Sequence, residues 1–219
     1  MAILDRPHWE TVDRKMVELL RQIGQQQFVS RFYLAGGTAL ALQLGHRRSV
    51  DFDFFSELDQ VKPDTHQEIL RALDSLKPQV MEKAFGNFVL SVGGISVGFF
   101  DYGYPLVGQG VRVENVALAS LFDIGLMKMD ALASRGSRKD FYDLYFVAQQ
   151  IPLDELLEKS KRKYPLYRDF PLMFLKYVVL FDNADRDVQP DMIIPVEWSA
   201  VKVFFANQVR QLSQKQFGF

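Results

Sequence analysis

The segment from Leu34 to Ser56 constrains the fold more than any other part of this chain. A strand over Phe32–Ala35 is followed by the turn Gly36–Thr38 and by a short apolar stretch that predicts a helix over Thr38–Leu44. A polar loop then leads into a second strand, Val50–Phe55. The order strand, helix, strand places a glycine turn beside the second strand.

Asp51 and Asp53 lie two residues apart on that second strand. Side chains alternate between the faces of a strand, so both carboxylates point the same way while Phe52 and Phe54 face the core. At about 5 Å and an effective dielectric near 20, the two charges repel by about 3 kcal/mol. A bound cation removes this cost. Backbone N–H groups of the Gly36–Thr38 turn, at the start of a helix, suit a phosphate bridged to that cation.

The composition limits which classes of protein this chain can belong to. Its 219 residues, 48% of them hydrophobic, suffice for one sizeable core or two small subdomains. No apolar run reaches the roughly 18 residues of a membrane span, and the start of the sequence lacks a signal-peptide core, so we expect a cytoplasmic protein. A net charge of -1 gives no general attraction to nucleic acid. Without cysteine, a metal would be held by oxygen or imidazole, which favours Mg²⁺ or Mn²⁺.

A third acid follows later in the sequence. Segments between Gln79 and Tyr102 favour β structure and are broken at Gly86-Asn87 and Gly93-Gly94, which predicts an antiparallel run of strands. Asp101 ends an alternating apolar row. A strand-end aspartate can simply reach solvent, but a third carboxylate after a paired set makes a metal-binding role for Asp101 our prediction.

Beyond Val113 the sequence predicts helices to the end, without a low-complexity linker. We therefore expect an α+β fold: a mixed sheet flanked by helices in residues 1–114, then an all-helical C-terminal subdomain in residues 115–219. The predicted boundary lies near Glu114.

The helical half contains a second group of charged residues. Lys128 and Arg135 share one largely apolar helix face, where a polyphosphate could pair with them or their long side chains could reach the rim. Asp140 lies at the third position of the next helix and suits a capping box. Lys139 and Asp143 could form an ordinary surface ion pair. The functional alternative has Lys139 neutralising phosphate and Asp143 orienting a cation.

Two further features are weaker indications. The densest basic cluster, with interleaved tyrosines, could bind a phosphate backbone or be a solvated helix end; its members are Lys159, Lys161, Arg162, Lys163, Tyr164, Tyr167 and Arg168. His8 and His66 are predicted to be surface residues, and His46 is a candidate substrate contact.

Together, the GGTALAL turn, the HRRSVDFDFF and FFDY strands and the K...R...KDFYDLYF helices resemble the AbiEii/AbiGii toxin family of nucleotidyltransferases, within the DNA polymerase β-like superfamily. The resemblance runs from about Tyr33 to Val147. It implies a nucleotidyltransferase-type sheet. It further implies that the catalytic and metal-binding residues are Asp51, Asp53 and Asp101, and that nucleotide binding uses Gly36, Gly37, Thr38, Lys128, Lys139 and Asp143. Asp140 also matches the helical motifs.

The implied reaction is metal-dependent transfer of a nucleoside monophosphate from a nucleoside triphosphate, with two Mg²⁺ or Mn²⁺ ions clamping the attacking and departing oxygens. The implied acceptor is RNA such as tRNA, or a protein. The resemblance implies a toxin of a bacterial toxin-antitoxin or phage-defence system, with a cognate antitoxin as a partner. Two alternatives remain open: a DxD-type glycosyltransferase, and an inert nucleotidyltransferase-fold binding module.

Overall fold

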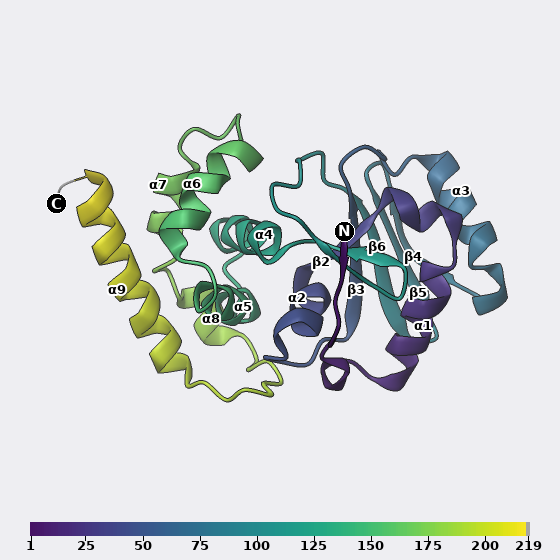
Figure 1. Cartoon of the computed structure of the whole chain (residues 1–219), viewed down its shortest axis with the longest axis horizontal. Coiled ribbons are helices and arrows are strands. Elements are labelled where there is room, and N and C mark those ends of the chain that lie inside the picture. The colour runs from purple at the N-terminus through teal and green to yellow at the C-terminus, as the bar shows by residue number, and fades with distance from the viewer. Residues whose placement is uncertain (218–219) are drawn as a thin grey trace. The chain divides into compact units, whose positions relative to one another are not determined.

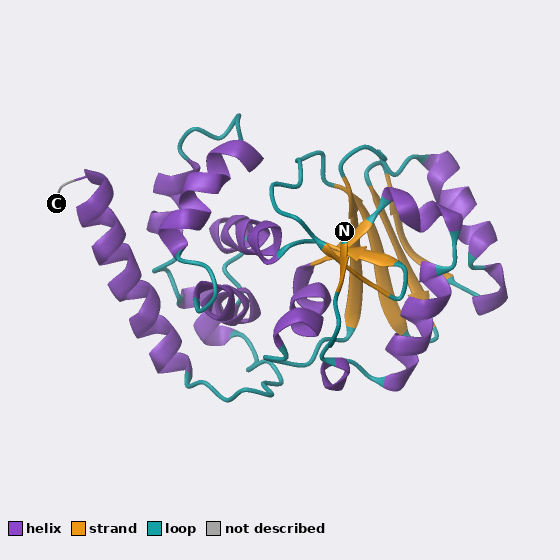
Figure 2. Cartoon of the chain, in the orientation of Figure 1, coloured by secondary structure: helices purple, strands orange, loops and turns teal. Residues whose placement is uncertain are grey.

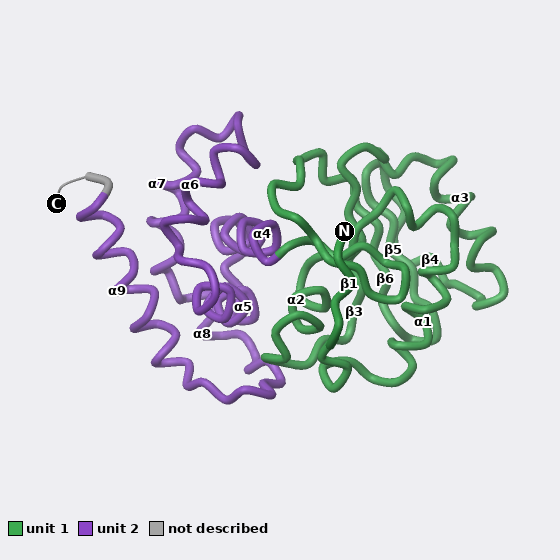
Figure 3. Tube along the Cα trace, viewed as in Figure 1, with its two compact units in different colours: residues 1–120 green, residues 121–219 purple. Residues whose placement is uncertain are grey.

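A mixed β-sheet organises the first half of the chain. The computed structural model describes residues 1–217 and divides into two compact units, Met1–Ser120 and Leu121–Phe219 (Figure 3). In the described residues the sheet has eight strands in the order β1-β7-β8-β2-β3-β6-β5-β4. The strands are β1 (Ala2–Ile3), β2 (Tyr33–Ala35), β3 (Asp51–Ser56), β4 (Gln79–Ala84), β5 (Asn87–Val92), β6 (Ile95–Asp101), β7 (Val111–Val113) and β8 (Val116–Leu118).

Strand direction changes across this sheet. β3 pairs in parallel with β6 and antiparallel with β2, while β4, β5 and β6 form the predicted antiparallel run. The turns of that run carry Gly86, Gly93 and Gly94, all at positive φ. The centre of the sheet is therefore β2-β3-β6, and it holds the predicted glycine turn and aspartate strand.

Three α-helices belong to the first unit: α1 (Arg14–Gly24), α2 (Gly36–Leu44) and α3 (Pro63–Ala72). α1 and α3 lie on one side of the sheet and α2 on the other (Figure 1). The core lies on the α3 side, where the stacked rings of Phe54 and Phe99 are fully buried and Phe28 meets Phe99 edge-on. His66 is also buried here, stacked on Phe88, so the prediction of a surface histidine is wrong.

The chain does not become helical directly after Val113. β7 and β8 form a hairpin, and β8 pairs in parallel with β2, so this part of the prediction is wrong. Three-residue strands give too short a pattern to be recognised in sequence. Residues 115–120 thus complete the sheet of the first unit, beyond the predicted boundary at Glu114.

The second unit contains only helices among its described residues, shown in purple in Figure 2. They are α4 (Leu121–Ser134), α5 (Arg138–Ala148), α6 (Leu153–Lys163), α7 (Phe170–Tyr177), α8 (Asp182–Arg186) and α9 (Trp198–Phe217). Phe141 of α5 packs against the rings of Phe181, Trp198 and Phe205, which joins the helices around one aromatic core. The predicted α+β fold, a mixed sheet followed by an all-helical C-terminal half, is confirmed.

Candidate active site

Strand β3 presents its two aspartates on one face. Asp51, Asp53 and Phe55 are half-buried, whereas Phe52, Phe54 and Ser56 between them are buried. This alternation places both carboxylates side by side on the face opposite the core.

The glycine turn approaches this pair closely. Gly36 is at a φ of +65°, and a β-carbon on it would lie 2.9 Å from Oδ2 of Asp53. Only glycine combines this backbone conformation with so close a contact. The glycine turn therefore packs directly against the Asp53 carboxylate.

A hydroxyl chain ties the first turn of α2 to β3. The Thr38 hydroxyl donates to the main-chain carbonyl of Asp51. The Ser49 hydroxyl lies 2.7 Å from the Thr38 hydroxyl and 3.5 Å from Oδ1 of Asp51. The threonine of the turn thus fixes the start of the aspartate strand against the start of the helix.

Arg47 completes this cluster, although no sequence pattern predicted a role for it. Its side chain is buried, and Nη1 donates to the carbonyl of Arg48 at 2.9 Å. A β-carbon on Gly37 would lie 2.3 Å from Nη2, so the guanidinium rests directly against the glycine turn. A permanent positive charge therefore lies beside the phosphate cradle. His46, the predicted substrate contact, is fully buried.

Asp101 does not join the pair. β6 runs parallel to β3 with Gly98 opposite Asp53 and with Asp101 opposite Ser56. Asp101 is thus three residues, about 10 Å, farther along the sheet. It continues the core-facing row of Phe99, so it points to the other face. The predicted convergence of three acids is wrong, and residues 1–217 contain no cluster of three or more acidic or histidine side chains able to hold a metal.

In the second unit, Lys128 forms a buried ion-pair network with two predicted site residues. Its Nζ lies 2.7 Å from Oδ1 of Asp140 and 2.7 Å from Oδ2 of Asp143, and all three side chains are almost completely buried. The alternative that the Lys128 side chain reaches the rim of the helix face is therefore wrong. The network joins α4 to α5.

Asp140 is the centre of this network. Arg135 donates to both of its carboxylate oxygens, Nε to Oδ2 at 2.7 Å and Nη2 to Oδ1 at 2.9 Å, and the Ser137 hydroxyl donates to Oδ2 at 2.6 Å. Burial alone would raise the pKa of Asp140, but the charges and hydrogen bonds of Lys128 and Arg135 hold it far below its ordinary value. Ser137 thus bonds the carboxylate instead of forming the predicted capping box with a main-chain N–H.

The other cations of the helical half divide into buried and exposed groups. Lys139 is exposed, so its predicted surface pair with the buried Asp143 is not formed. Lys163 is fully buried and lies 2.9 Å from Oδ1 of Asp123, an acid that the sequence analysis missed. Tyr164 is buried against Phe170. The basic cluster is therefore not one continuous surface.

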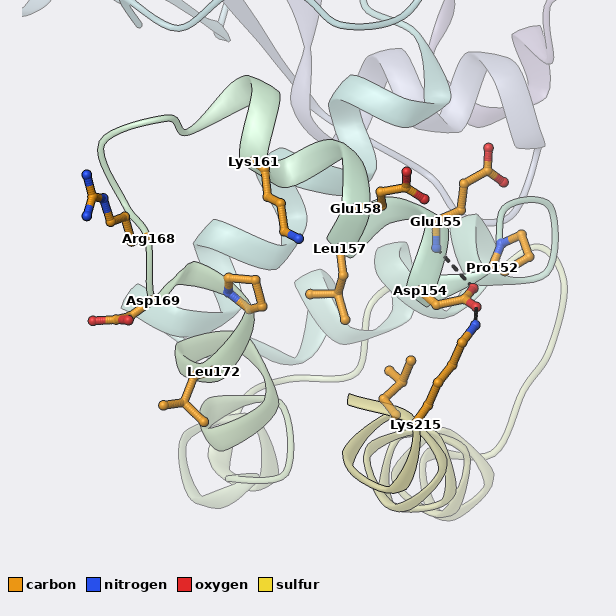
Figure 4. Close-up of a pocket in the computed structure, with 12 residues that line it drawn as sticks. Pro152, Asp154, Glu155, Leu157, Glu158, Lys161, Arg168, Asp169, Leu172 and Lys215 are labelled. Carbon is orange, nitrogen blue, oxygen red and sulfur yellow. Dashed lines mark hydrogen bonds and ion pairs between the residues drawn. The ribbon is translucent and has the colours of Figure 1, made fainter. Parts of the chain in front are cut away.

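A cavity of about 820 Å³ opens between α6, α7 and α9 (Figure 4). Lys161 and Arg168 of the basic cluster line it, but so do Glu155, Glu158 and Asp169. Across it, Lys215 pairs with Asp154 at 2.7 Å. Because charges of both signs line this cavity, it does not favour an anionic ligand such as a nucleic acid backbone.

Comparison with known proteins identifies the family. The model of the AbiEii nucleotidyl transferase toxin, a type IV toxin-antitoxin component, matches residues 18–115, which include the glycine turn and both aspartates. An uncharacterized protein of Aquifex aeolicus (strain VF5) is 36% identical over 199 residues, covering 89% of this chain and 94% of that protein. The chain belongs to the AbiEii nucleotidyltransferase toxin family.

Solved structures similar to this AbiEii family member share its fold. MenT4, a nucleotidyltransferase toxin from Mycobacterium tuberculosis H37Rv, has a TM-score of 0.55 at 18% identity, with 90% of this chain and 84% of MenT4 covered. The antibiotic-resistance factor ANT(2'')-Ia has a TM-score of 0.55 at 14% identity, covering 73% of this chain and 97% of that protein. JHP933 from Helicobacter pylori has a TM-score of 0.51 at 14% identity, covering 98% and 94%. The nucleotidyltransferase-type fold is confirmed.

The chain is thus a member of a nucleotidyltransferase toxin family, and its fold is of the nucleotidyltransferase type. The matched segment ends before Lys128, Lys139 and Asp143, so their nucleotide-binding roles stay predictions. Every helix within residues 1–217 is too short or too polar to cross a lipid bilayer.

Proposed function

We propose that this protein transfers a nucleoside monophosphate from a nucleoside triphosphate to an acceptor, in a reaction that requires Mg²⁺ or Mn²⁺. One observation carries the proposal: the Gly36–Thr38 turn is fastened to the strand that presents Asp51 and Asp53, with Gly36 in direct approach to the Asp53 carboxylate. This arrangement puts a phosphate cradle and a pair of metal-binding oxygens within reach of one ligand.

The donor set fits a hard divalent cation. Asp51 and Asp53 offer carboxylate oxygens on one face, and both side chains keep part of their surface exposed. Mg²⁺ is commonly held by one or two carboxylates, with substrate phosphates and water supplying the other ligands, so the displacement of Asp101 does not prevent binding. Such an ion, when bound, would polarise the α-phosphate and neutralise charge on the departing pyrophosphate.

The residues of the chain would orient the nucleotide. The N–H groups at the start of α2 would bind phosphate oxygens, and the buried Arg47 guanidinium adds positive charge beside them. Lys128 and Lys139 are proposed to steady the departing pyrophosphate, and Asp143 to orient a cation, as the family resemblance implies. No proton acceptor is assigned, because Asp101 lies on the opposite face of the sheet.

The acceptor is proposed to be RNA, such as tRNA, or a protein, and the biological role that of a toxin controlled by a cognate antitoxin. Membership of the AbiEii toxin family supports this role. The fold alone does not identify the acceptor, because proteins of similar fold can bind different ones. ANT(2'')-Ia has been solved in complex with adenylyl-2''-tobramycin. A second candidate is an inert binding module, which the displaced third acid favours.

The test is incubation of the protein with each α-labelled nucleoside triphosphate, Mg²⁺ and either total RNA or total protein. We expect label in one acceptor class, lost with a chelator and lost in Asp53→Asn. The control is Arg48→Gln, which also changes one charged residue to an amide close to the aspartate strand. Because Arg48 is exposed, this variant should transfer normally. Absence of label in both acceptor classes with all four nucleotides would overturn the enzyme proposal in favour of the inert module.

A further inference from the structure

A second row of aromatic rings lies on the site face of the sheet. Phe55 and Phe100, on neighbouring strands, have ring centroids 5.2 Å apart. Tyr102 meets Phe55 edge-on at 5.5 Å, and Tyr104 meets Tyr102 at 5.1 Å. All four side chains are half-buried. We call Phe55, Phe100, Tyr102 and Tyr104 the aromatic row.

The aromatic row begins directly beside the acidic pair. Phe55 follows Asp53 by two residues on β3, so its side chain points to the same face about 7 Å farther along. On β6, Gly98 is the register partner of Asp53, and a β-carbon on it would lie 2.4 Å from the ring of Phe100. The Phe100 ring therefore folds back over the backbone next to Asp53.

The opposite face of the same strands shows what purely structural packing looks like. Phe54 and Phe99 stack at 5.2 Å and are fully buried, within a core that also includes Phe28 and Phe32. The aromatic row differs because its rings keep exposed surface and adjoin charged groups. Partly exposed aromatic surface beside a polar site is typical of ligand binding.

We propose that the aromatic row, centred on Phe55 and Phe100, is a nucleobase-binding site whose rings stack against the base of a nucleotide bound at the acidic pair. This inference rests on the proposed function, since it takes Asp51 and Asp53 to hold the phosphates through a bound divalent cation. Stacking accepts any base because every base has a flat π-face. A nucleotide matches this order of surfaces. Its phosphates would lie at the cation held by the carboxylates, and its flat base, one sugar away, would lie at the aromatic row.

The base can come from the incoming nucleoside triphosphate or from the end of a nucleic acid acceptor. Both present the same chemistry to the row. Binding measurements can separate them: the triphosphates ATP, GTP, CTP and UTP, inorganic tripolyphosphate, which lacks a base, and a short single-stranded oligoribonucleotide, each with Mg²⁺ and full-length protein.

The variants are Phe55→Leu and Phe100→Leu, with Phe100→Tyr retaining a ring. Phe85→Leu is the matched control, because Phe85 is an exposed aromatic residue of the same unit outside the row. We expect each leucine variant to weaken binding of a base-containing ligand about tenfold to a hundredfold, while tripolyphosphate binding stays the same. The thermal midpoint should fall by only about 2–4 °C, because each variant loses ring contacts that are partly exposed. Phe100→Tyr and Phe85→Leu should bind as the wild type does.

Each outcome decides the inference. Weakened triphosphate binding assigns the site to the incoming base, and weakened oligoribonucleotide binding alone assigns it to the acceptor. Unchanged binding of both, equal weakening of tripolyphosphate, or a wild-type protein that binds neither ligand overturns the proposal. A third outcome separates the two proposals. If the leucine variants lose base-selective binding but the wild type transfers no label, the proposed function is refuted and the nucleobase site is supported.

Discussion

Two groups of charged side chains in this molecule look alike in sequence and differ in physical state. On β3, Asp51 and Asp53 share a half-exposed face beside a glycine turn. In the helical unit, Asp140 and Asp143 are fully buried around Lys128, at 2.7 Å each. Each group consists of two closely spaced acids, and both pairs belong to the motifs that carry the family resemblance.

The difference separates acids that keep access to solvent from acids that burial has enclosed among their partners. A buried carboxylate must be paired, because an isolated charge in a low-dielectric interior is very costly. Asp140 meets this requirement with Lys128, Arg135 and Ser137. The β3 pair combines two neighbouring carboxylates, solvent access and an adjacent N–H cradle, so a cation can reach it.

The largest expected effect is on catalysis. Asp53→Ala should lower nucleotidyl transfer by about 10³-fold or more, because the several kcal/mol of stabilisation supplied through a bound metal would be lost. The protein should still fold, since Asp53 is half-buried on the face of β3 opposite the core. Initial rates of label incorporation and thermal melting check the two halves of this prediction. A folded variant with normal transfer would show that Asp53 takes no part in the reaction.

The next effect concerns the buried pair of Asp123 and Lys163. Lys163→Met should cost about 3 kcal/mol, because Asp123 is left as an uncompensated buried charge. Combining it with Asp123→Leu should recover most of that loss. Urea unfolding followed by circular dichroism gives both free energies. A single variant as stable as the wild type would show that the pair makes no net contribution.

A smaller loss is expected at the centre of the network. Asp140→Asn should cost about 2 kcal/mol, since Lys128 keeps Asp143 as a partner while Arg135 loses its bidentate contact. The exposed Asp154–Lys215 pair is the control, and Asp154→Asn should leave the urea midpoint unchanged. Equal effects of the two substitutions would contradict the distinction between buried and exposed pairs.

Asp140 should also make stability depend on pH. Its folded pKa lies below the ordinary aspartate value of about 4, so its contribution is complete above that value and is lost as the pH falls toward the folded pKa. Urea midpoints should therefore fall as the pH drops below about 4, and less steeply in Asp140→Asn. Parallel declines in the two proteins would mean that other carboxyls govern acid unfolding.

The smallest expected effect on stability is at the glycine turn. Gly36→Ala should cost about 1 kcal/mol, because the residue is at a φ of +65°. It should also impair transfer by displacing the Asp53 carboxylate, 2.9 Å from the added carbon. Gly93→Ala imposes a similar backbone strain in open space, so it should cost stability and leave transfer unchanged. Normal transfer by Gly36→Ala would show that the glycine turn is not part of the active site.

The sequence by itself determined the local parts of this protein. Alternation on β3 predicted the shared face of Asp51 and Asp53, and period-two and helical patterns predicted the hairpins and the helical half correctly. These patterns express short-range geometry, which depends on neighbours a few residues away. Short strands such as β8 gave too little pattern to be found.

Only the tertiary structure decided which side chains meet. Strand register moved Asp101 to the far face, although its own strand was predicted correctly, because pairing between strands depends on contacts distant in sequence. Tertiary packing likewise pairs Lys163 with Asp123 and places the Arg47 side chain against Gly37. Partners of a charged side chain are set by the packing of whole elements, and a linear pattern does not contain that information.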